Sequence, residues 1–248
     1  MEQVLLITGA SRGIGAATAR LAGQRGWRVV VNYQSRAEEA QAVVDHVVAA
    51  GSEAVAIQAD VSKEAGVLAL FEQIHQHFGR LDGLVNNAGV VDQVAKLQDM
   101  DTARLQRMLR INVLGPMLCA REAVRRMALS LGGRGGAIVN IGSAASRIGS
   151  PGQYVDYAAS KGALDTFTLG LAREVASDGI RVNAVRPGII DTDIHASGGQ
   201  PNKARDAASG IPMLRAGHAQ EVAQAVLWLL SEEASYTTGA LLDVAGGR

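Results

Sequence analysis

Short apolar runs, each of strand length, recur along the chain at residues 4–8, 28–32, 54–58, 83–86, 137–141, 181–185 and 240–244. Segments long enough for helices lie between them, at 13–25, 37–50, 64–78, 102–131, 154–177 and 220–230. Strands that alternate with helices predict a parallel sheet with helices on both faces. We therefore expect one doubly wound α/β domain over residues 1–248, with seven strands in the order 3-2-1-4-5-6-7.

One stretch, from residue 191 to about 217, breaks this alternation and is rich in Gly, Ser, Asn and Pro. Long irregular segments inside compact domains are usually lids or binding loops. We expect a substrate lid there. Two helix boundaries are also expected: Gly51 as a left-handed residue after the second helix, and Ser62 as the N-cap of the third.

Composition excludes several classes of function. Lys and Arg total 24, as do Asp and Glu, so the formal charge is +0. This balance argues against nucleic acid and anionic membranes as partners. Cys119 is the single cysteine, so neither an intramolecular disulfide nor a thiolate metal cluster is expected, and a reducing cytoplasm is the expected location. No run of 18 apolar residues occurs, so we expect neither export nor a membrane span.

A glycine-rich turn, Thr8-Gly9-Ala10-Ser11-Arg12-Gly13-Ile14-Gly15, links the first strand to the first helix. Its spacing is G-x-x-x-G-x-G. We expect Gly9 to permit the tight turn, Gly13 to let a pyrophosphate approach the backbone, and Gly15 to let helix and strand pack closely. A phosphate would then lie at the positive end of the helix, which indicates a dinucleotide site.

The residues after the second strand indicate which dinucleotide binds. The sequence Val31-Asn32-Tyr33-Gln34-Ser35-Arg36 carries no acid to hold a ribose 2′-hydroxyl. Arg12 and Arg36 would instead attract a 2′-phosphate, so we expect NADP(H), with NAD(H) less favoured. The alternative is that both arginines are ordinary solvated loop residues.

Tyr157 and Lys161 are separated by four residues, which places them on one face of a predicted helix. A tyrosine titrates near pH ~10 and is a weak base unless a cation stabilises its phenolate. Lys161 would supply that cation. The same hydroxyl would protonate a carbonyl oxygen as hydride reaches the carbon in the reductive direction.

Two further polar residues are candidates for the same site. Ser143 ends the fifth strand, at the edge where open α/β sheets bind ligands, and would hold the substrate oxygen. Asn112 lies in mid-helix, where Asn is a mediocre helix former, so its side chain is expected to have a polar task. Taken singly, a serine cap, a backbone-bonded Asn and a half-buried Tyr would each have a structural explanation.

Taken together, and in this order, these residues resemble the short-chain dehydrogenase/reductase family over essentially the whole chain. The resemblance also rests on Asp60-Val61, Asn86-Asn87-Ala88-Gly89, Pro187-Gly188 with Thr192, and Gly246-Gly247. Within the family, the sequence is similar to the glucose 1-dehydrogenase-like and 3-oxoacyl-carrier-protein reductase-like branches. This resemblance implies a Rossmann fold, a small carbonyl or alcohol substrate, and a homotetramer.

The resemblance assigns roles to particular positions. Asp60 and Val61 would contact adenine, Asn87 to Gly89 would line the cofactor cleft, and Ile189 and Thr192 would hold the carboxamide. Asn112 would help to hold a water in a proton relay from Lys161. The predicted catalytic residues are Asn112, Ser143, Tyr157 and Lys161, and no metal ligand is expected. The predicted cofactor-binding residues are Gly9, Ser11, Arg12, Gly13, Ile14, Gly15, Asn32, Tyr33, Arg36, Asp60, Val61, Asn87, Ala88, Gly89, Tyr157, Lys161, Pro187, Gly188, Ile189 and Thr192.

The substrate itself is not identified by the sequence. Candidate pocket residues are Asp92, Gln93, Ser146, Gln153, Tyr154, Ile189 and His195. Asp178 stands before Gly179-Ile180, where carrier-protein reductases often have a basic residue, so we expect no dedicated docking of acidic carrier proteins, unless Arg125, Arg126 and Arg134 form a patch. A non-catalytic NADP(H) sensor or scaffold, or an epimerase or dehydratase that reuses the cofactor, are alternatives on the same fold.

Overall fold

The computed structural model describes residues 3–248, except for the side chain of His195. Seven parallel strands form one sheet in the order β3-β2-β1-β4-β5-β6-β7. The strands are β1 (Val4–Ile7), β2 (Arg28–Tyr33), β3 (Ala54–Gln58), β4 (Gly83–Asn86), β5 (Gly136–Ile141), β6 (Ile180–Pro187) and β7 (Leu241–Val244). The predicted strand order and fold class are confirmed.

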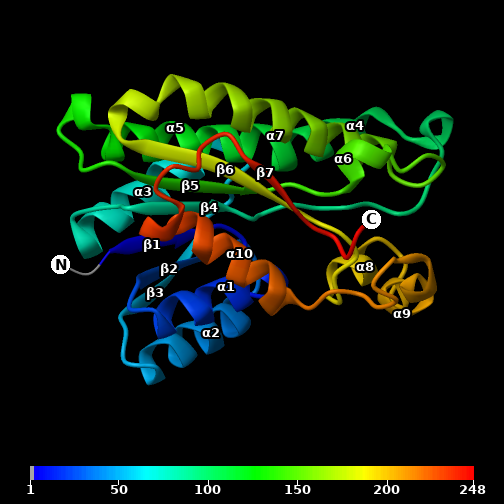
Figure 1. The fold of residues 1–248 in the computed structure, drawn as a ribbon, viewed down its shortest axis with the longest axis horizontal. Helices are drawn as coiled ribbons and strands as arrows, with labels where there is room; N and C mark the ends of the chain where they lie inside the picture. The colour runs from blue at the N-terminus through cyan, green and yellow to red at the C-terminus, as the bar shows by residue number, and fades with distance from the viewer. Residues whose placement is uncertain (1–2) are drawn as a thin grey trace.

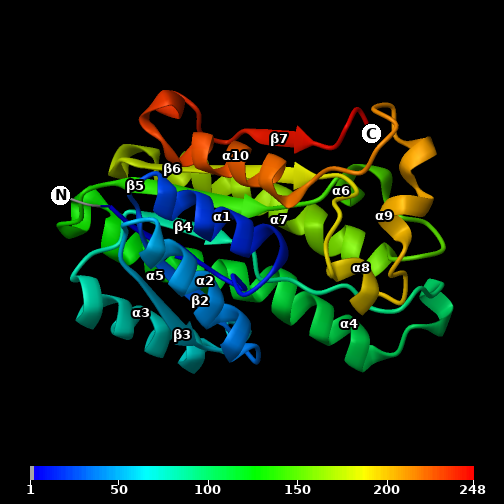
Figure 2. The same cartoon turned by 90° about the horizontal axis from the view of Figure 1, so that it is seen from below.

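Helices cover both faces of the sheet (Figures 1 and 2). One face carries α1 (Gly13–Gln24), α2 (Ala37–Ala49) and α10 (Ala219–Leu230). The other carries α3 (Glu64–Phe78), α5 (Gly115–Met127) and α7 (Val155–Glu174), with α4 (Thr102–Leu109) packed against α7. The short helices are α6 (Ala145–Ile148), α8 (Ile194–Ser197) and α9 (Lys203–Asp206).

The central strands β1, β4 and β5 are almost entirely buried and mostly apolar, because helices cover both sides of the sheet there. Successive side chains of a strand point to opposite faces. In β1, Leu5 and Ile7 pack with α1, α2 and α10, whereas Val4 and Leu6 pack with α3 and α5. The two resulting cores hold the sheet rigid, so the loops at its carboxyl edge start from fixed positions.

The segment expected to be one helix over residues 102–131 is divided in the structure. After α4, residues Arg110–Leu114 form a π-helical turn, α5 then runs to Met127, and a 3-10 turn follows at Leu129–Leu131. Pro116 has no N–H to donate to the Asn112 carbonyl four residues earlier, which accounts for the widened turn. The prediction of a continuous helix was therefore wrong at Asn112.

Smaller boundaries differ in the same local way. Gly51 is left-handed, with φ +90°, as predicted. Ser62 is not the N-cap of α3, because Lys63 holds that position and the Ser62 hydroxyl donates to Asp60 Oδ1 at 2.7 Å instead. The lid segment 191–217 is more regular than expected, since α8, α9 and a 3-10 turn lie within it. None of the described helices combines the length and the apolar character that crossing a membrane requires.

Candidate active site

A cavity of about 610 Å³ opens along the carboxyl edge of the sheet, between the loops after β1 to β6 and the lid segment. All predicted site residues line it except Gly15 and Asn112, which lie just behind its wall. The lining members are Gly9, Ser11, Arg12, Gly13, Ile14, Asn32, Tyr33, Arg36, Asp60, Val61, Asn87, Ala88, Gly89, Ser143, Tyr157, Lys161, Pro187, Gly188, Ile189 and Thr192. Residues far apart in the sequence thus share one cleft.

The glycine turn gives one end of this cleft a narrow backbone wall. Gly9 and Gly13 have φ of +61° and +57°, which residues with a side chain rarely adopt. A Cβ at Gly9 would lie 2.9 Å from Ala88 Cα, and one at Gly15 would lie 2.8 Å from the Gly9 oxygen. Since α1 begins at Gly13, the free N–H groups of its first turn lie at the cleft, where they suit an anion.

Two side chains join the turn after β1 to the loop after β4. The Thr8 hydroxyl oxygen accepts hydrogen bonds from Asn87 N and Ala88 N, each at 3.0 Å. The Asn87 amide in return donates to the carbonyls of Thr8 and Gly9 at 2.8 and 3.0 Å. Asn87 therefore fixes the shape of the phosphate turn as well as lining the cleft.

Asn32 has a structural task that the sequence did not reveal. Its side chain is buried, accepts from Gly9 N at 3.3 Å, and donates to Ile57 and Ala59 carbonyls at 3.3 and 3.2 Å. These bonds tie the ends of β1, β2 and β3 together. The Asn32 side chain therefore supports the cleft wall, and its polar atoms are already bonded to the protein.

Arg12 and Arg36 both face the cleft, and each has an acidic neighbour. Arg12 lies 3.8 Å from Asp193 of the lid, and Arg36 lies 2.9 Å from Glu39 of α2. Both arginines are substantially exposed, so these pairs are weak and exchangeable. Two cations thus stand beside the end of β2, as the sequence predicted.

The opposite wall is built from β6 and the chain that follows it. Gly188 N donates to Val244 O at 3.0 Å, and a Cβ at Gly188 would lie 2.8 Å from Ala245 Cα. Thr192 comes near the glycine turn, because a Cβ at Gly13 would lie 3.6 Å from its methyl group. This wall therefore closes directly over the turn.

Tyr157 lies near the middle of the cleft, half-buried in the first turns of α7. Its hydroxyl is hydrogen-bonded to Ser143, which follows β5. Burial raises the pKa of the phenol, and the Ser143 hydrogen bond lowers it by a smaller amount. The phenol therefore stays protonated in this structure and is a proton donor at neutral pH.

Lys161 lies one turn further along α7 and is only 4% exposed. Its Nζ donates to the Ile141 carbonyl at 2.7 Å and lies 5.7 Å from the centre of the Tyr157 ring. Burial lowers the pKa of Lys161 to about 8, although the nearby Asp165 carboxylate raises it. The amine can therefore change its charge near neutral pH.

Asn112 lies behind this pair, in the π-helical turn, with no exposed surface. Its amide exchanges two hydrogen bonds of 2.9 Å with the backbone of Val90 and donates to Ser160 Oγ at 3.1 Å. Ser160 Oγ in turn donates to the Tyr157 carbonyl at 2.7 Å. Asn112 thus joins the loop after β4 to the helix that carries Tyr157.

Beyond Tyr157, the cleft continues between α6, the start of α7 and the lid. Gln153, Tyr154 and Ile189 line it, as predicted from the sequence. Asp92, Gln93 and Ser146 do not, and Asp92 is instead paired with Arg107. The side chain of His195 lies outside what the structure describes. Lining residues missed by the sequence analysis include Val90, Val91, Ile111, Ile148, Lys203 and Arg248.

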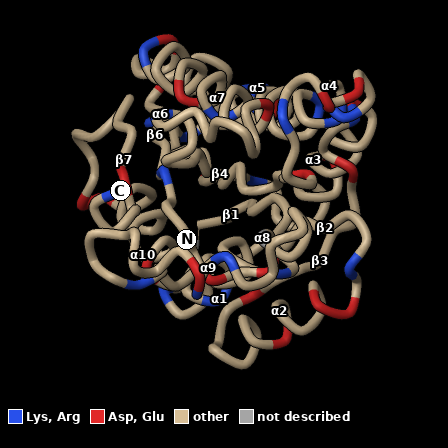
Figure 3. The backbone as a smooth tube through the Cα atoms, turned by 90° about the vertical axis from the view of Figure 1, so that its right-hand side faces the viewer, with Lys and Arg blue, Asp and Glu red and all other residues tan. Residues whose placement is uncertain are grey.

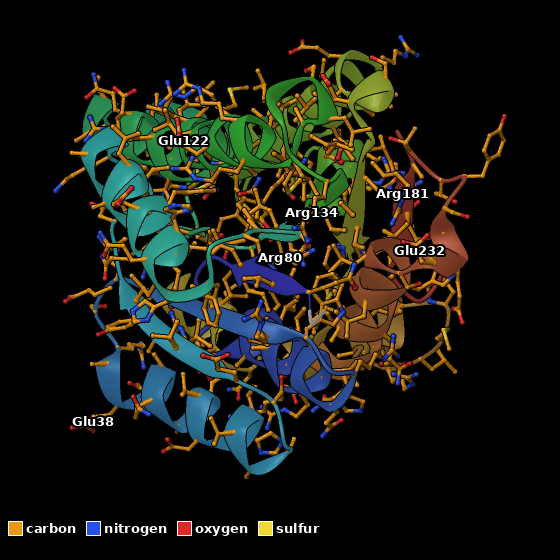
Figure 4. The ribbon with its side chains drawn as sticks, turned by 90° about the vertical axis from the view of Figure 1, so that its left-hand side faces the viewer. Glu38, Arg80, Glu122, Arg134, Arg181 and Glu232 are labelled. Carbon is orange, nitrogen blue, oxygen red and sulfur yellow. The ribbon has the colours of Figure 1, made fainter. Side chains whose placement is uncertain are left out.

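The residues used to argue against carrier-protein docking are far from the cleft. Asp178 directly precedes β6, and Arg134 precedes β5. Both therefore lie at the amino edge of the sheet, opposite the site. Figure 4 labels Arg134. Arg125 and Arg126, near the end of α5, pair with Glu122 at 2.7 and 2.9 Å. Asp178 therefore does not lie beside the active-site mouth.

The chain is similar in sequence and in structure to known oxidoreductases. A family model described as enoyl-(acyl carrier protein) reductase matches residues 9–248. An uncharacterised oxidoreductase of Escherichia coli, YgfF, is 55% identical over 99% of both chains. Glucose 1-dehydrogenase 2 of Bacillus subtilis is 40% identical over 98% of this chain and 93% of its own. A solved short-chain dehydrogenase/reductase from Serratia marcescens superposes with a TM-score of 0.90, at 35% identity, over 99% of this chain and 97% of that one.

Proposed function

The chain belongs to the short-chain dehydrogenase/reductase family of oxidoreductases, and on that premise we propose that it transfers a hydride between NADP(H) and a small carbonyl or alcohol, with Tyr157 as the general acid and base. The observation that supports this most is the meeting of Ser143, Tyr157 and Lys161 on one cleft wall, although they come from β5 and α7.

The residues around the cleft fit an NAD(P) cofactor, which is the cofactor of the family. Gly9 and Gly13 leave an open wall at the start of α1, where the N–H groups of the first turn suit a pyrophosphate. Asp60 and Val61 would hold the adenine, and Ile189 with Thr192 the carboxamide. Arg12 and Arg36 supply the positive charge that a 2′-phosphate needs, which supports NADP(H) over NAD(H).

When bound, the nicotinamide supplies or accepts the hydride at the substrate carbon. The chain itself handles the proton. Ser143 holds the substrate oxygen beside the Tyr157 hydroxyl, and Tyr157 gives its proton to that oxygen during reduction. Lys161 then stabilises the phenolate by its charge and renews the proton through its amine. Asn112 keeps α7 and the loop after β4 in register.

The test is Tyr157→Phe, assayed by carbonyl-dependent loss of NADPH absorbance. Because general acid catalysis contributes about 10²–10⁴-fold, we expect the rate to fall by at least about 10²-fold. NADPH binding, measured by its fluorescence, should be retained. Tyr236→Phe makes the same change on a fully exposed tyrosine and should leave the rate as it is. A Tyr157→Phe variant with normal turnover would exclude the proposed role.

The other readings give different results in the same assay. A sensor or scaffold would bind NADPH and turn over no carbonyl in the wild-type protein. An epimerase or dehydratase would convert substrate with no net change in absorbance. We also propose that the chain forms a homotetramer, as its resemblance to the family implies.

A further inference from the structure

The part of the cleft beyond Tyr157 has a chemical character of its own. It is lined by Ser150 and Gln153 from the loop before α7, by Tyr154, by Lys203 of α9 and by Arg248. Figures 1 and 2 agree in placing the C-terminal end of the described chain near α6 and α9. Two cations from distant parts of the sequence therefore meet at this end.

Neither cation forms an ion pair with an acidic side chain among residues 3–248. The Lys203 amine donates to Gln153 Oε1 at 3.3 Å and lies 4.6 Å from the centre of the Tyr154 ring. Asp243, which precedes Arg248 in the same C-terminal stretch, pairs with Arg147 at 3.3 Å and with Arg186 at 2.8 Å. Both signs of charge are intermixed on the side of the molecule that carries α8 and α9 (Figure 3).

The acidic side chains on the cleft wall have other hydrogen-bond or ion-pair partners. They are Asp60, which accepts from Ser62 and pairs with Lys63, and Asp193, which pairs with Arg12 near the cofactor end. Burial lowers the pKa of Lys203, and the positive charge of Arg248 lowers it further. An anion between the two cations would relieve this repulsion.

Hydrogen bonds hold the main chain near both cations. The Tyr154 hydroxyl lies within hydrogen-bonding distance of Gly198 O, at 3.2 Å, and of Gln200 Oε1, at 3.1 Å, so α7 holds the lid that carries Lys203. Arg147 of α6 donates to the main-chain oxygen of Arg248 at 2.9 Å. The segments that carry Lys203 and Arg248 are thus both tied by hydrogen bonds to residues at the cleft.

We propose that Lys203 and Arg248 bind an anionic group of the substrate, so that the enzyme acts on carbonyl or alcohol compounds that carry a carboxylate or a phosphate. This inference rests on the proposed function, because it places the anion beyond the group that reacts at Tyr157. Charge-assisted hydrogen bonds from these side chains would orient the substrate and favour it over a neutral analogue.

The experiment compares matched substrates that differ in charge. 4-Oxopentanoate and 5-oxohexanoate are assayed with NADPH against their methyl esters, and dihydroxyacetone phosphate against dihydroxyacetone. We expect kcat/KM of the charged member to be about tenfold higher or more in at least one pair, the size of one charge-assisted contact. The pair with the larger ratio distinguishes a carboxylate from a phosphate. Added salt should reduce the ratio.

Variants separate a binding role from a structural one. Lys203→Gln and Arg248→Gln should each lower the charged-to-neutral ratio by about tenfold, mainly through KM, while Lys203→Arg keeps it. Lys96→Gln removes the same charge from an exposed position outside the cleft and should leave the ratio unchanged. Two results would overturn the proposal. One is a charged-to-neutral ratio of kcat/KM near one for the wild type in every pair. The other is a Lys203→Gln variant in which kcat/KM falls equally for the charged and the neutral substrate.

A second measurement does not depend on turnover. Pentanoate and pentanamide have the same shape and differ in charge, and each is added to the protein with NADPH. Pentanoate should raise the melting temperature of the wild type more than pentanamide does, and this difference should disappear in Lys203→Gln. Equal effects of both compounds would contradict anion binding even if no carbonyl were reduced, which by itself would contradict only the proposed function.

Discussion

Asp165 is a buried charge one helical turn beyond Lys161. Its Oδ2 lies 3.5 Å from Arg186 Nη1, whereas its Oδ1 has no hydrogen-bond partner within the described residues. That oxygen faces the cleft floor, since a Cβ built on Gly142 would lie 3.3 Å from it. An unpartnered carboxylate oxygen here is costly, and its charge acts on Lys161.

We therefore expect Asp165→Asn to change the pH dependence of the reaction. Because the carboxylate raises the pKa of Lys161, its removal should lower that pKa below the present value of about 8. We expect kcat to fall as Lys161 loses its proton at alkaline pH, and this fall should move to lower pH in Asp165→Asn. Asp45→Asn, an exposed change on α2, is the matched control. An unmoved profile would show that Asp165 has a packing role only.

We expect the proposed preference for NADP(H) to depend most directly on Arg12. Loss of one charge-assisted contact costs roughly 1.5–3 kcal/mol, so Arg12→Ala should reduce the ratio of kcat/KM for NADPH to that for NADH by about tenfold or more. Asp193→Asn removes the acid beside Arg12 and should preserve the NADPH preference or increase it. If Arg12→Ala weakens both cofactors equally, Arg12 acts through the lid instead.

At the scale of elements, side-chain caps fix both ends of α10 behind the cleft. Glu221 accepts from His218 N at 2.8 Å and pairs with Arg215 at 2.6 Å, which caps the first turn. At the other end, Arg181 of β6 donates to the carbonyls of Leu229 and Leu230 at 2.6 and 3.2 Å. Figure 4 shows Arg181 beside this end of the helix, near Glu232.

Glu221→Gln should therefore destabilise the fold. A glutamine can still accept from His218 N, so the loss comes from the negative charge, and because both partners of the Arg215 pair are exposed, solvent screening keeps it at about 1 kcal/mol or less. These contacts lower the pKa of Glu221 from 4.5 to about 2, so the contribution is complete above pH 4.5 and disappears as the pH falls toward 2. Urea unfolding at pH 7 and at pH 3 measures it. Glu233→Gln, on an exposed acid, should have no comparable effect.

Glu122 of α5 shows the same principle in a more buried setting. It is 3% exposed and accepts from Arg121, Arg125 and Arg126 at 3.2, 2.7 and 2.9 Å (Figure 4). Burial alone would raise the pKa of Glu122, but the hydrogen bond from Arg126 and the nearby positive charges bring it below its ordinary value. The three arginines at this end of α5 are thus ion-paired within the chain.

At the scale of the whole molecule, α4 and α7 leave apolar surface uncovered. Leu109 and Leu169 are 52% and 37% exposed, whereas Met108 of α4 and Leu118 of α5 are buried within the chain. Gly162 and Gly170 leave α7 flat, because nothing lies within 4 Å of a Cβ built on either. A flat apolar helix face suits an isologous contact with a second copy.

We therefore expect a tetramer by light scattering at micromolar concentration. Leu169→Arg should reduce the mass, because it places a charge in the contact without disturbing the core. Leu68→Arg, on the exposed side of α3, controls for a general effect on solubility. A wild-type protein that is monomeric under these conditions would contradict the proposed assembly.

The sequence by itself determined the order of the sheet, the glycine turn, and the set of residues at the cleft. The signals are the short apolar runs that alternate with helical segments, the conformational freedom of Gly9 and Gly13, the four-residue spacing of Tyr157 and Lys161, and the family resemblance for the remaining cleft residues. A period or a spacing can be read from neighbours in the chain.

Only the tertiary structure decided which polar atoms remain free to bind a ligand. Asn32 and Asn112 are occupied by contacts with residues 25 and 48 positions away, and Arg147 reaches Arg248 across 101 positions. The π-helical turn, the Tyr154 contact with the lid, and the meeting of Lys203 with Arg248 have the same origin. Partners brought together by packing leave no periodic signal in the chain, because their spacing depends on where every intervening element turns.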